Sequence, residues 1–370
     1  MTRGHARLEQ ITLRRISLPL CRPYHVSYRV YEHFEPIVVE MRDGDGRSGW
    51  GEGHISPGYS HETVDGGWAF CRAQAERALG LPVAEAKATL IAGIDASPVA
   101  STALITALEM LEGSPLLRLD AAVRLPLLTP LHGTSENAVH EEVEHRLQEG
   151  FRTFKVKVGK DVLRDLERVR VVQRALAGRA TLRLDANRGF SRADGCRFAA
   201  ALEPAGIELF EQPCAADDWT ANAAVAQASA VPVMLDESIY GMADIERAAA
   251  LEGVGLIKLK LKKLGSLERL KRGLERIREL GMEPVLGDGV AAEIGCWMEA
   301  CVARSTIRNA GEMNGFLKPK ARLFSAPLRF ADGALQLDAG FTPEIDRDAL
   351  GAHTLAVEHL KAPRIAAASA

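Results

Sequence analysis

Three carboxylates at regular intervals are the residues of this chain best suited to chemistry. Asp185, Glu211 and Asp236 each stand at the end of an apolar run, with about 25 residues between neighbours. This spacing matches one strand and one helix, and the ends of successive strands of a parallel barrel meet on one rim. Clustered carboxylate oxygens are hard ligands that suit Mg²⁺. The three residues therefore predict a magnesium site.

Two lysines continue the same spacing outward on either side of the acids. Lys157 precedes Asp185 and Lys260 follows Asp236, each by about one strand-and-helix unit. A lysine serves as a base only if its pKa falls from about 10.4 toward neutrality, which burial and neighbouring cations promote. Removing a proton beside a carboxylate creates a doubly charged enediolate, which a metal at the carboxylate oxygens stabilises. The pattern predicts metal-assisted proton abstraction.

The elements that position these residues alternate along the middle of the chain. Short apolar strands and amphipathic helical stretches follow one another from about residue 125. The predicted strands are residues 125–129, 153–158, 181–186, 208–211, 232–236, 256–260, 283–286 and 306–310. Eight such repeats favour a closed parallel barrel over an open doubly wound sheet. The first strand has the weakest pattern, because Pro126 cannot donate to a ladder.

The two ends of the chain read differently from the barrel. Residues 36–41 alternate and are closed by the turn at 43–46, a hairpin signal, and Ala-rich helical sequence follows. We therefore expect an α+β capping domain over residues 1–120 and a barrel over 121–325. Residues 326–370 contain a second hairpin around Asp332-Gly333, which we expect to return to the N-terminal sheet. Without a Pro/Ser linker, the parts should form one rigid body.

Composition excludes several classes of protein. The 370 residues are 47% hydrophobic with a net charge of −3 and a pI near 6.4, which argues against nucleic acid as a partner. We see neither a secretory signal nor an apolar run of the roughly 18 residues that a membrane span needs, and expect a cytoplasmic protein. The six cysteines are scattered without a CxxC pair, which favours reduced, mostly buried thiols.

Five motifs in order make a family resemblance clear. They are Phe154-Lys155-Val156-Lys157, Leu184-Asp185-Ala186-Asn187, Phe210-Glu211-Gln212-Pro213, Leu235-Asp236-Glu237-Ser238 and Ile257-Lys258-Leu259-Lys260. Together they resemble the enolase superfamily, and within it the muconate lactonizing enzyme subgroup. Residues 49–52 and 57–60, the latter with Tyr59, look like that family's N-terminal capping domain.

The resemblance implies a fold, a cofactor and a site. The fold would be α/β, a modified TIM barrel of the (β/α)7β type with an α+β cap completed by the C-terminal segment. Asp185, Glu211 and Asp236 would bind one Mg²⁺ per active site. Lys157 and Lys260 would face each other across a small-molecule carboxylate substrate. The family also implies a homo-oligomer.

Four neighbouring residues are expected to support this site. Lys155 shares a strand face with Lys157 and would act as its supporting cation. Lys258 would project beneath Lys260, where its ammonium needs a carboxylate partner that Asp236 or Glu237 could supply. Asn187 and Glu237 follow metal ligands and look like groups that orient them.

Residues that select the substrate are harder to place. By resemblance, loop 22–31 should close over the barrel mouth, which brings Tyr24, Tyr28 and Tyr31 toward the substrate together with Tyr59. Asp288 and Glu312 end the seventh and eighth strands. The family's dipeptide epimerases place a paired Asp-x-Asp at the eighth strand, where this chain has Glu312 and Asn314. That difference argues against dipeptides.

Several reactions stay open at this point. Two opposed lysines permit racemisation or epimerisation by 1,1-proton transfer. A cycloisomerase, a syn-eliminating dehydratase or an o-succinylbenzoate synthase-like lyase could use one lysine as base or acid and the other as electrostatic support. A non-catalytic protein that binds Mg²⁺ and carboxylates is a distant alternative. A Schiff-base aldolase would use a barrel lysine but leave the three acids unexplained.

Overall fold

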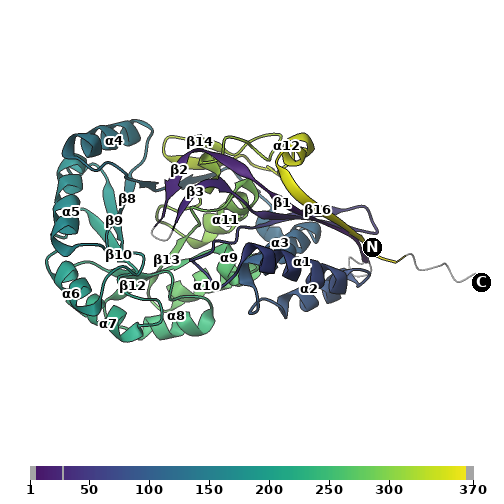
Figure 1. Cartoon of the computed structure of the whole chain (residues 1–370), viewed down its shortest axis with the longest axis horizontal. Helices are drawn as coiled ribbons and strands as arrows, with labels where there is room; N and C mark the ends of the chain where they lie inside the picture. The colour runs from purple at the N-terminus through teal and green to yellow at the C-terminus, as the bar shows by residue number, and fades with distance from the viewer. Residues whose placement is uncertain (1–5, 27–28, 364–370) are drawn as a thin grey trace, which may run out of the picture.

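A four-stranded antiparallel sheet and three helices form the cap of the molecule. The computed structural model describes residues 6–26 and 29–363. The sheet order is β16 (Thr354–Lys361), β1 (Leu8–Ile16), β4 (Ile37–Asp43) and β5 (Ser48–Gly53). The helices α1 (Val64–Ala78), α2 (Val83–Ile91) and α3 (Pro98–Leu111) cover one face of this sheet (Figure 1).

Glycines let α3 lie directly on β5. A Cβ at Gly49 would come within 2.1 Å of the Ala107 carbonyl oxygen, and a Cβ at Gly51 equally close to that of Ala103. Only glycine tolerates this approach of backbone to backbone. The motif that resembles the family's cap is therefore explained by packing, because it brings the helix against the strand that faces the barrel.

The barrel is a curled parallel sheet with helices on its outside (Figure 1). Its strands in order are β7 (Thr129–Pro130), β8 (Thr153–Lys157), β9 (Thr181–Asp185), β10 (Ile207–Glu211), β11 (Val233–Leu235), β12 (Val254–Leu259) and β13 (Glu283–Leu286). Its helices are α4 (Glu136–Gln148), α5 (Val162–Leu176), α6 (Arg192–Ala200), α7 (Trp219–Ala228), α8 (Met242–Ala249), α9 (Leu261–Leu264), α10 (Leu267–Glu279) and α11 (Glu293–Thr306). The predicted fold class is confirmed.

The first and eighth strands differ from the prediction. Residues 123–126 form β6 (Val123–Pro126), which pairs antiparallel with β15 (Ala334–Leu337), so the barrel begins only at β7. Helix α11 extends to Thr306, and in place of a strand over 306–310 the barrel closes through Gly311 and Glu312. The Glu312 amide donates to Leu286 O at 2.9 Å, and the Leu128 amide donates to Gly311 O at 3.0 Å.

The C-terminal segment reaches the cap by another strand than expected. The predicted hairpin exists as β14 (Arg329–Ala331) and β15, but it pairs with β6 and does not extend the cap sheet. After α12 (Arg347–Ala352), β16 crosses to the cap and pairs with β1. The hairpin was misplaced because alternation shows that a strand exists but not which neighbour it chooses. The domain limits near residues 120 and 325 stay predictions.

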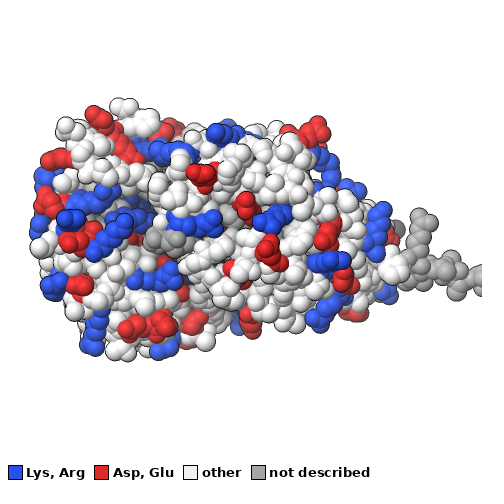
Figure 2. All heavy atoms as spheres, in the orientation of Figure 1, with Lys and Arg blue, Asp and Glu red and all other residues white. Residues whose placement is uncertain are grey.

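The surface and the cysteines match the composition. Both signs of charge are interspersed over the face drawn in Figure 2. All six cysteines are free, and four of them are buried. Within the ranges described above, no helix is both long and apolar enough to cross a membrane.

Candidate active site

The candidate site is a narrow cavity at the carboxyl ends of the barrel strands. The cap contributes Tyr24, Val26 and Tyr59 to its wall. The barrel contributes Lys155, Lys157, Asp185, Asn187, Asp236, Lys258, Lys260, Lys262, Asp288, Gly289, Val290 and Glu312. Most of the predicted site residues therefore meet around one space, as the strand spacing requires.

The three acids lie side by side beneath this cavity. Asp185 and Glu211 are register partners on β9 and β10, and Asp236 follows β11. Each of the three is 1% exposed. Burial opposes ionisation, yet Lys155 and Lys157 hold the pKa of Asp185 below its usual value. For Glu211 burial dominates, and together with Asp185 it raises the pKa to about 7.

The two predicted bases occupy opposite ends of this row of acids. Lys157 Nζ lies 2.6 Å from Asp185 Oδ2, and Lys260 Nζ lies 2.8 Å from Asp236 Oδ2. Glu211 stands between those two acids in the strand order. An α-carbon held over Glu211 would thus have one lysine toward each side.

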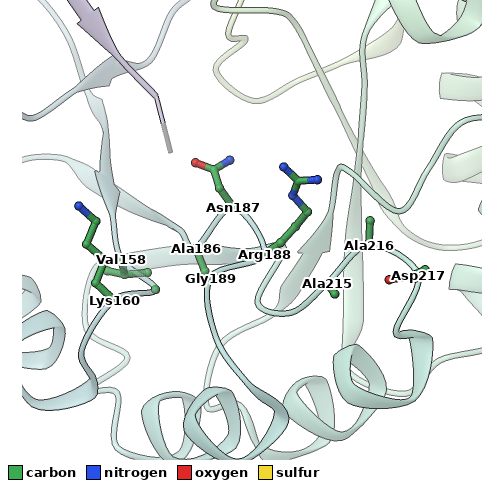
Figure 3. A pocket seen from close by; sticks show the side chains of 10 residues that line it. Val158, Lys160, Ala186, Asn187, Arg188, Gly189, Ala215, Ala216 and Asp217 are labelled. Atoms are coloured by element: carbon green, nitrogen blue, oxygen red, sulfur yellow. The ribbon is translucent and has the colours of Figure 1, made fainter. Parts of the chain in front are cut away.

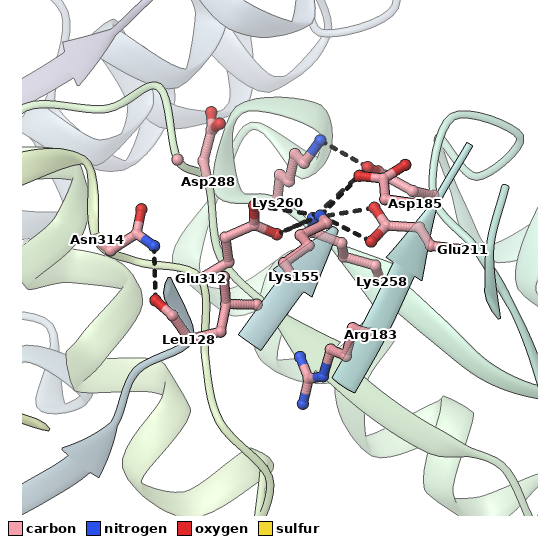
Figure 4. A network of polar contacts seen from close by, with 12 residues as sticks. Leu128, Lys155, Arg183, Asp185, Glu211, Lys258, Lys260, Asp288, Glu312 and Asn314 are labelled. Carbon is pink, nitrogen blue, oxygen red and sulfur yellow. Dashed lines mark hydrogen bonds and ion pairs between the residues drawn. The ribbon is translucent and has the colours of Figure 1, made fainter. Parts of the chain in front are cut away.

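Two further lysines fill the space below. Lys155 Nζ contacts Asp185 Oδ2 at 2.7 Å and Glu211 Oε2 at 2.8 Å, and its side chain is 2% exposed. In Figure 4 the ammonium groups of Lys155 and Lys258 converge between Glu312 and the pair of Asp185 and Glu211. Buried ammonium groups favour the ionised form of neighbouring carboxylates, so Lys155 lowers the pKa of Asp185 against the effect of burial as well as standing beside Lys157.

Glu312 has a different role from the one expected. It was predicted to select the substrate, but it lies between Lys155, at 3.1 Å, and Lys258, both of which donate to it. Lys258 also donates to Glu211 at 3.2 Å and stays 3.8 Å from Asp236. Of the two expected partners of Lys258, Asp236 lies within ion-pair distance, but Glu312 and Glu211 lie closer. Glu312, at the eighth barrel position, is the main carboxylate partner of Lys258. The sequence did not indicate this contact because the two residues lie far apart along the chain.

The residue types suit Mg²⁺, whereas the side chains do not converge on one point. Among residues 6–26 and 29–363, no three His, Cys, Asp or Glu side chains are grouped so as to hold a metal. The oxygens of Asp185 and Asp236 are instead directed to lysines. Glu211 Oε2 is buried and accepts no geometrically sound hydrogen bond within the described chain, although Lys155 lies close. Three adjacent carboxylates with such an oxygen are a donor set for Mg²⁺.

Asn187 and Gln212 hold the ends of the acid-bearing strands. The backbone nitrogen of Asn187 donates to Asp185 Oδ1 at 2.9 Å, and the side-chain oxygen of Asn187 accepts from Lys157 Nζ at 2.6 Å. Its Nδ2 donates to Glu237 Oε1 at 3.2 Å. Gln212, which the sequence did not single out, accepts from the Asp236 amide at 3.0 Å. Both residues have positive φ, 42° and 36°, so contacts rather than backbone preference keep them there.

Lys262 and Lys263 also belong to the site, which the sequence did not predict. Lys263 Nζ lies 2.8 Å from Asp236 Oδ1, and Lys262 Nζ lies 2.6 Å from Asp288 Oδ2. Strand alternation continued beyond Lys260 would place Lys262 on the face of Lys260 and Lys263 away from it. Because α9 begins at Leu261, that alternation ends at Lys260 and helical spacing turns both side chains inward.

The predicted tyrosines separate into three groups. Tyr24 and Tyr59 line the cavity, as does Asp288. Tyr31 is 2% exposed and packs against Phe34 and His54, so its prediction as a substrate residue was wrong. Tyr28 lies outside the described residues.

A second hollow lies beside the site over the loops that follow β8, β9 and β10. Its lining residues are Val158, Gly159, Lys160, Ala186, Asn187, Arg188, Gly189, Ala215, Ala216 and Asp217. Figure 3 shows Asn187 and Arg188 standing side by side above Ala186 and Gly189. Asn187 is common to both spaces, so this hollow adjoins the side of the cavity where Lys157 lies.

Comparisons with known proteins support a family assignment. Residues 138–349 match the family model described as enolase C-terminal domain-like. The L-Lys-D/L-Arg epimerase of Methylococcus capsulatus is 30% identical over 72% of this chain and 78% of that protein. The N-succinyl-L-Arg/Lys racemase of Bacillus cereus is 25% identical over 93% of this chain and 95% of its own.

Solved structures show the same fold along nearly the whole chain. The crystal structure of the N-succinyl Arg/Lys racemase from Bacillus cereus aligns with a TM-score of 0.88 at 23% identity, covering 96% of this chain and 100% of the other. That of muconate lactonizing enzyme from Pseudomonas fluorescens aligns with a TM-score of 0.84 at 23% identity, covering 94% and 99%.

Proposed function

Since the chain belongs to the enolase superfamily, we propose that it removes the α-proton of a carboxylate substrate and returns a proton to the opposite face. Relatives include epimerases, racemases and an o-succinylbenzoate synthase. The prediction of an isomerase of this superfamily, with a lyase as the alternative, is thereby confirmed at the level of class. Racemisation or epimerisation by two lysines is the finer proposal.

The observation that carries the proposal is the pairing of each lysine with an outer acid of the row. Lys157 is held by Asp185 and Asn187, and Lys260 by Asp236. One amine takes the α-proton while the opposite ammonium donates one, so the net change is inversion. A single base would suffice for elimination or cycloisomerisation, and then only one of the two lysines would need this placement.

Asp185, Glu211 and Asp236 are the residues that would hold Mg²⁺. The bound ion would supply a Lewis acid that stabilises the charge of the enediolate. Burial disfavours the ionised form of Asp185 and Asp236, but neighbouring lysines lower the pKa of both, so both carboxylates stay charged and able to bind a cation. The cavity wall carries five lysines against four carboxylates, which favours an anionic substrate.

The eighth barrel position supports an N-acyl amino acid rather than a dipeptide. Glu312 is shared by Lys155 and Lys258, and Asn314 donates to Leu128 O at 3.0 Å while it accepts from Lys318 at 2.8 Å. Neither side chain is left to bind a free ammonium group. We therefore propose that any amino group on the substrate is acylated and uncharged, as in the substrates that name the Bacillus cereus racemase.

Exchange of the α-proton with solvent deuterium tests the proposed function. The wild-type protein with Mg²⁺ is incubated in D₂O with N-acyl amino acids, betaines, lactones, acid sugars and dipeptides, and the α-proton is followed by NMR. We expect exchange and inversion of an N-acyl amino acid, both abolished by EDTA. Exchange that survives EDTA, or trapping of substrate by borohydride, would contradict the proposal, the latter in favour of a Schiff base.

Three further properties stay proposals. They are one Mg²⁺ per active site, a homo-oligomeric state and a cytoplasmic location. The Cytophaga hutchinsonii dipeptide epimerase, described as complexed with Mg and a dipeptide, shares this fold with a TM-score of 0.86 at 22% identity. That likeness supports the metal without fixing its ligands in this chain.

A further inference from the structure

We propose that Tyr59 of the cap positions Lys260 and separates it from water, so that the two bases exchange protons with solvent at unequal rates. This inference rests on the proposed two-lysine function. It assigns Tyr59 as a positioning residue, whereas the sequence suggested that it binds substrate.

Tyr59 contacts Lys260 in two ways. Lys260 Nζ donates to the Tyr59 hydroxyl at 2.7 Å, and that hydroxyl donates to Asp236 Oδ1 at 3.1 Å. The ammonium also lies 4.2 Å from the centre of the tyrosine ring. A hydroxyl that accepts from the lysine and donates to its carboxylate partner fixes the direction of the Nζ lone pair or proton.

The ring of Tyr59 covers a group of three ammonium ions. Lys262 Nζ lies 5.1 Å and Lys263 Nζ 5.5 Å from its centre, in addition to Lys260. Such cation–π contacts gain strength where water is excluded. Tyr59 of the cap therefore lies over Lys260 at this side of the barrel mouth.

The opposite lysine is more exposed. Lys157 is held by Asp185 and Asn187, both from the barrel, and its side chain is 40% exposed. The side chain of Lys260 is 8% exposed. Within the described chain, the side chain of Lys157 is therefore more accessible to water than that of Lys260.

This difference predicts an isotopic asymmetry during turnover. When Lys260 removes the α-proton, the C–H bond breaks, its electron pair passes to the enediolate, and the neutral amine becomes an ammonium. In D₂O the amine of Lys260 already carries two deuterons, so the ammonium that forms holds one proton and two deuterons. It returns the proton in some turnovers and a deuteron in others, so recovered substrate keeps part of its protium and is labelled slowly. A proton taken by Lys157 is replaced by deuterium before it returns. The enantiomer deprotonated by Lys157 should therefore be labelled faster than it is inverted.

A substrate-free measurement tests the shielding. The side-chain ammonium signals of the Mg²⁺-loaded full chain are recorded with ¹⁵Nζ-labelled lysine, and Lys157→Arg and Lys260→Arg assign them. We expect slow hydrogen exchange at Lys260, faster exchange in Tyr59→Phe and the fastest in Tyr59→Ala. Asn187→Gly, which removes the amide from Lys157 and keeps the positive φ, is the matched control and should leave the Lys260 signal unchanged.

The second arm uses both enantiomers of N-succinyl-arginine in D₂O. At early conversion, recovered substrate should be labelled faster for one enantiomer than for the other, and Tyr59→Phe should reduce the ratio of the two labelling rates roughly tenfold, as for loss of a hydrogen bond to a charged group. Asn187→Gly should not reduce it. If the probe does not react, the proposed substrate class is wrong, and the NMR arm still decides. Equal exchange at both lysines, or no effect of Tyr59→Phe and Tyr59→Ala on Lys260, would overturn the proposal.

Discussion

At the scale of single residues, the site is an alternating set of buried acids and lysines. Lys155 forms ion pairs with Asp185, Glu211 and Glu312, and Lys263 forms one with Asp236. Each charge is costly to bury alone and is tolerated because partners surround it. Substitution of one of these residues should therefore leave a neighbouring buried charge without a partner, in addition to removing the contacts of the substituted side chain itself.

The third predicted ligand is tested by Asp236→Asn. The amide is neutral and a poorer ligand, so Mg²⁺ affinity should fall by at least about tenfold and turnover should be lost. Calorimetric titration with Mg²⁺ measures the first effect, and circular dichroism should show a folded barrel. Unchanged Mg²⁺ affinity would mean that another acid is the third ligand, with Glu237 the next candidate.

Glu312→Gln should destabilise the fold. Lys155 and Lys258 would both lose their shared carboxylate in a buried space, a loss that typically costs about 3–5 kcal/mol. Urea unfolding gives the free energy. Glu279→Gln, which breaks an exposed pair with Arg276, is the control and should change stability little. A variant as stable as the wild type would show that this cluster tolerates unpaired lysines.

Individual residues also show where sequence reasoning succeeds. The three strand-end acids lie side by side with Lys157 and Lys260 at either end, as their spacing led us to expect, because barrel topology converts a period in sequence into neighbours in space. Lys263 was missed because the strand gives way to α9 directly after Lys260. Glu312 was placed at the correct rim, but its pairing with Lys258 could not be foreseen without side-chain geometry.

At the scale of elements, acids of the cap bind the amino ends of barrel helices. Glu52 on β5 accepts from the amides of Ala292 at 2.6 Å and Gly295 at 3.0 Å, at the start of α11. Glu109 on α3 accepts from Leu267 N at 2.8 Å, at the start of α10. Unpaired helix amides favour an acceptor there. These contacts hold the cap over the barrel mouth, so that Tyr59 of the cap lies in the cavity wall.

Glu52→Gln should remove part of the pH dependence of stability. Burial raises the pKa of Glu52 to about 7, from an ordinary value of 4.5. Between these two pH values the folded state keeps a proton that the unfolded state has lost. The stabilisation that this proton gives the folded state is therefore complete below about pH 4.5 and is lost as pH rises to about 7. The free energy of unfolding of the variant relative to wild type should rise between pH 5 and pH 8, by at most about 3 kcal/mol.

The matched control for that change is Glu85→Gln, which alters an exposed acid of the same cap on α2. Urea unfolding at both pH values should give the same difference from wild type for this variant. A pH-independent difference for Glu52→Gln would show that Glu52 is ionised in the folded protein throughout.

The segments at which the barrel begins and closes were the hardest to predict. The strand at 125–129 was expected in the barrel, yet Val123–Pro126 pairs with β15, because Leu125 and its neighbours suit either sheet. Closure at Gly311 needs only one bridge and a few backbone hydrogen bonds. So short a segment leaves no periodic signal for sequence analysis to find.

At the scale of the whole molecule, the two ends of the chain complete one sheet. In β16, residues from Thr354 to Lys361 pair with β1, next to β4 on its other side. The segment from Arg347 also donates to Glu40 of β4 at 2.8 Å. The cap is therefore a product of both ends of the chain.

Removal of residues 354–370 should loosen the cap. Strand β1 would lose one of its two neighbours, and its backbone groups on that edge would lose their partners. We expect a lower melting temperature and faster proteolysis of the cap than of the barrel. A chain that ends at residue 363 is the control for truncation itself. An unaltered melting temperature for the longer truncation would show that β16 is dispensable.

The two-lysine mechanism is tested most directly by stereospecific exchange in Lys157→Ala and Lys260→Ala. Each variant is incubated with Mg²⁺ and each enantiomer of a reactive N-acyl amino acid in D₂O, and the α-proton is followed by NMR. We predict that one variant loses exchange of one enantiomer and the other variant loses exchange of its mirror image. Loss of all exchange in one variant with partial exchange in the other would indicate a single base, and wild-type exchange in both would remove these lysines from the mechanism.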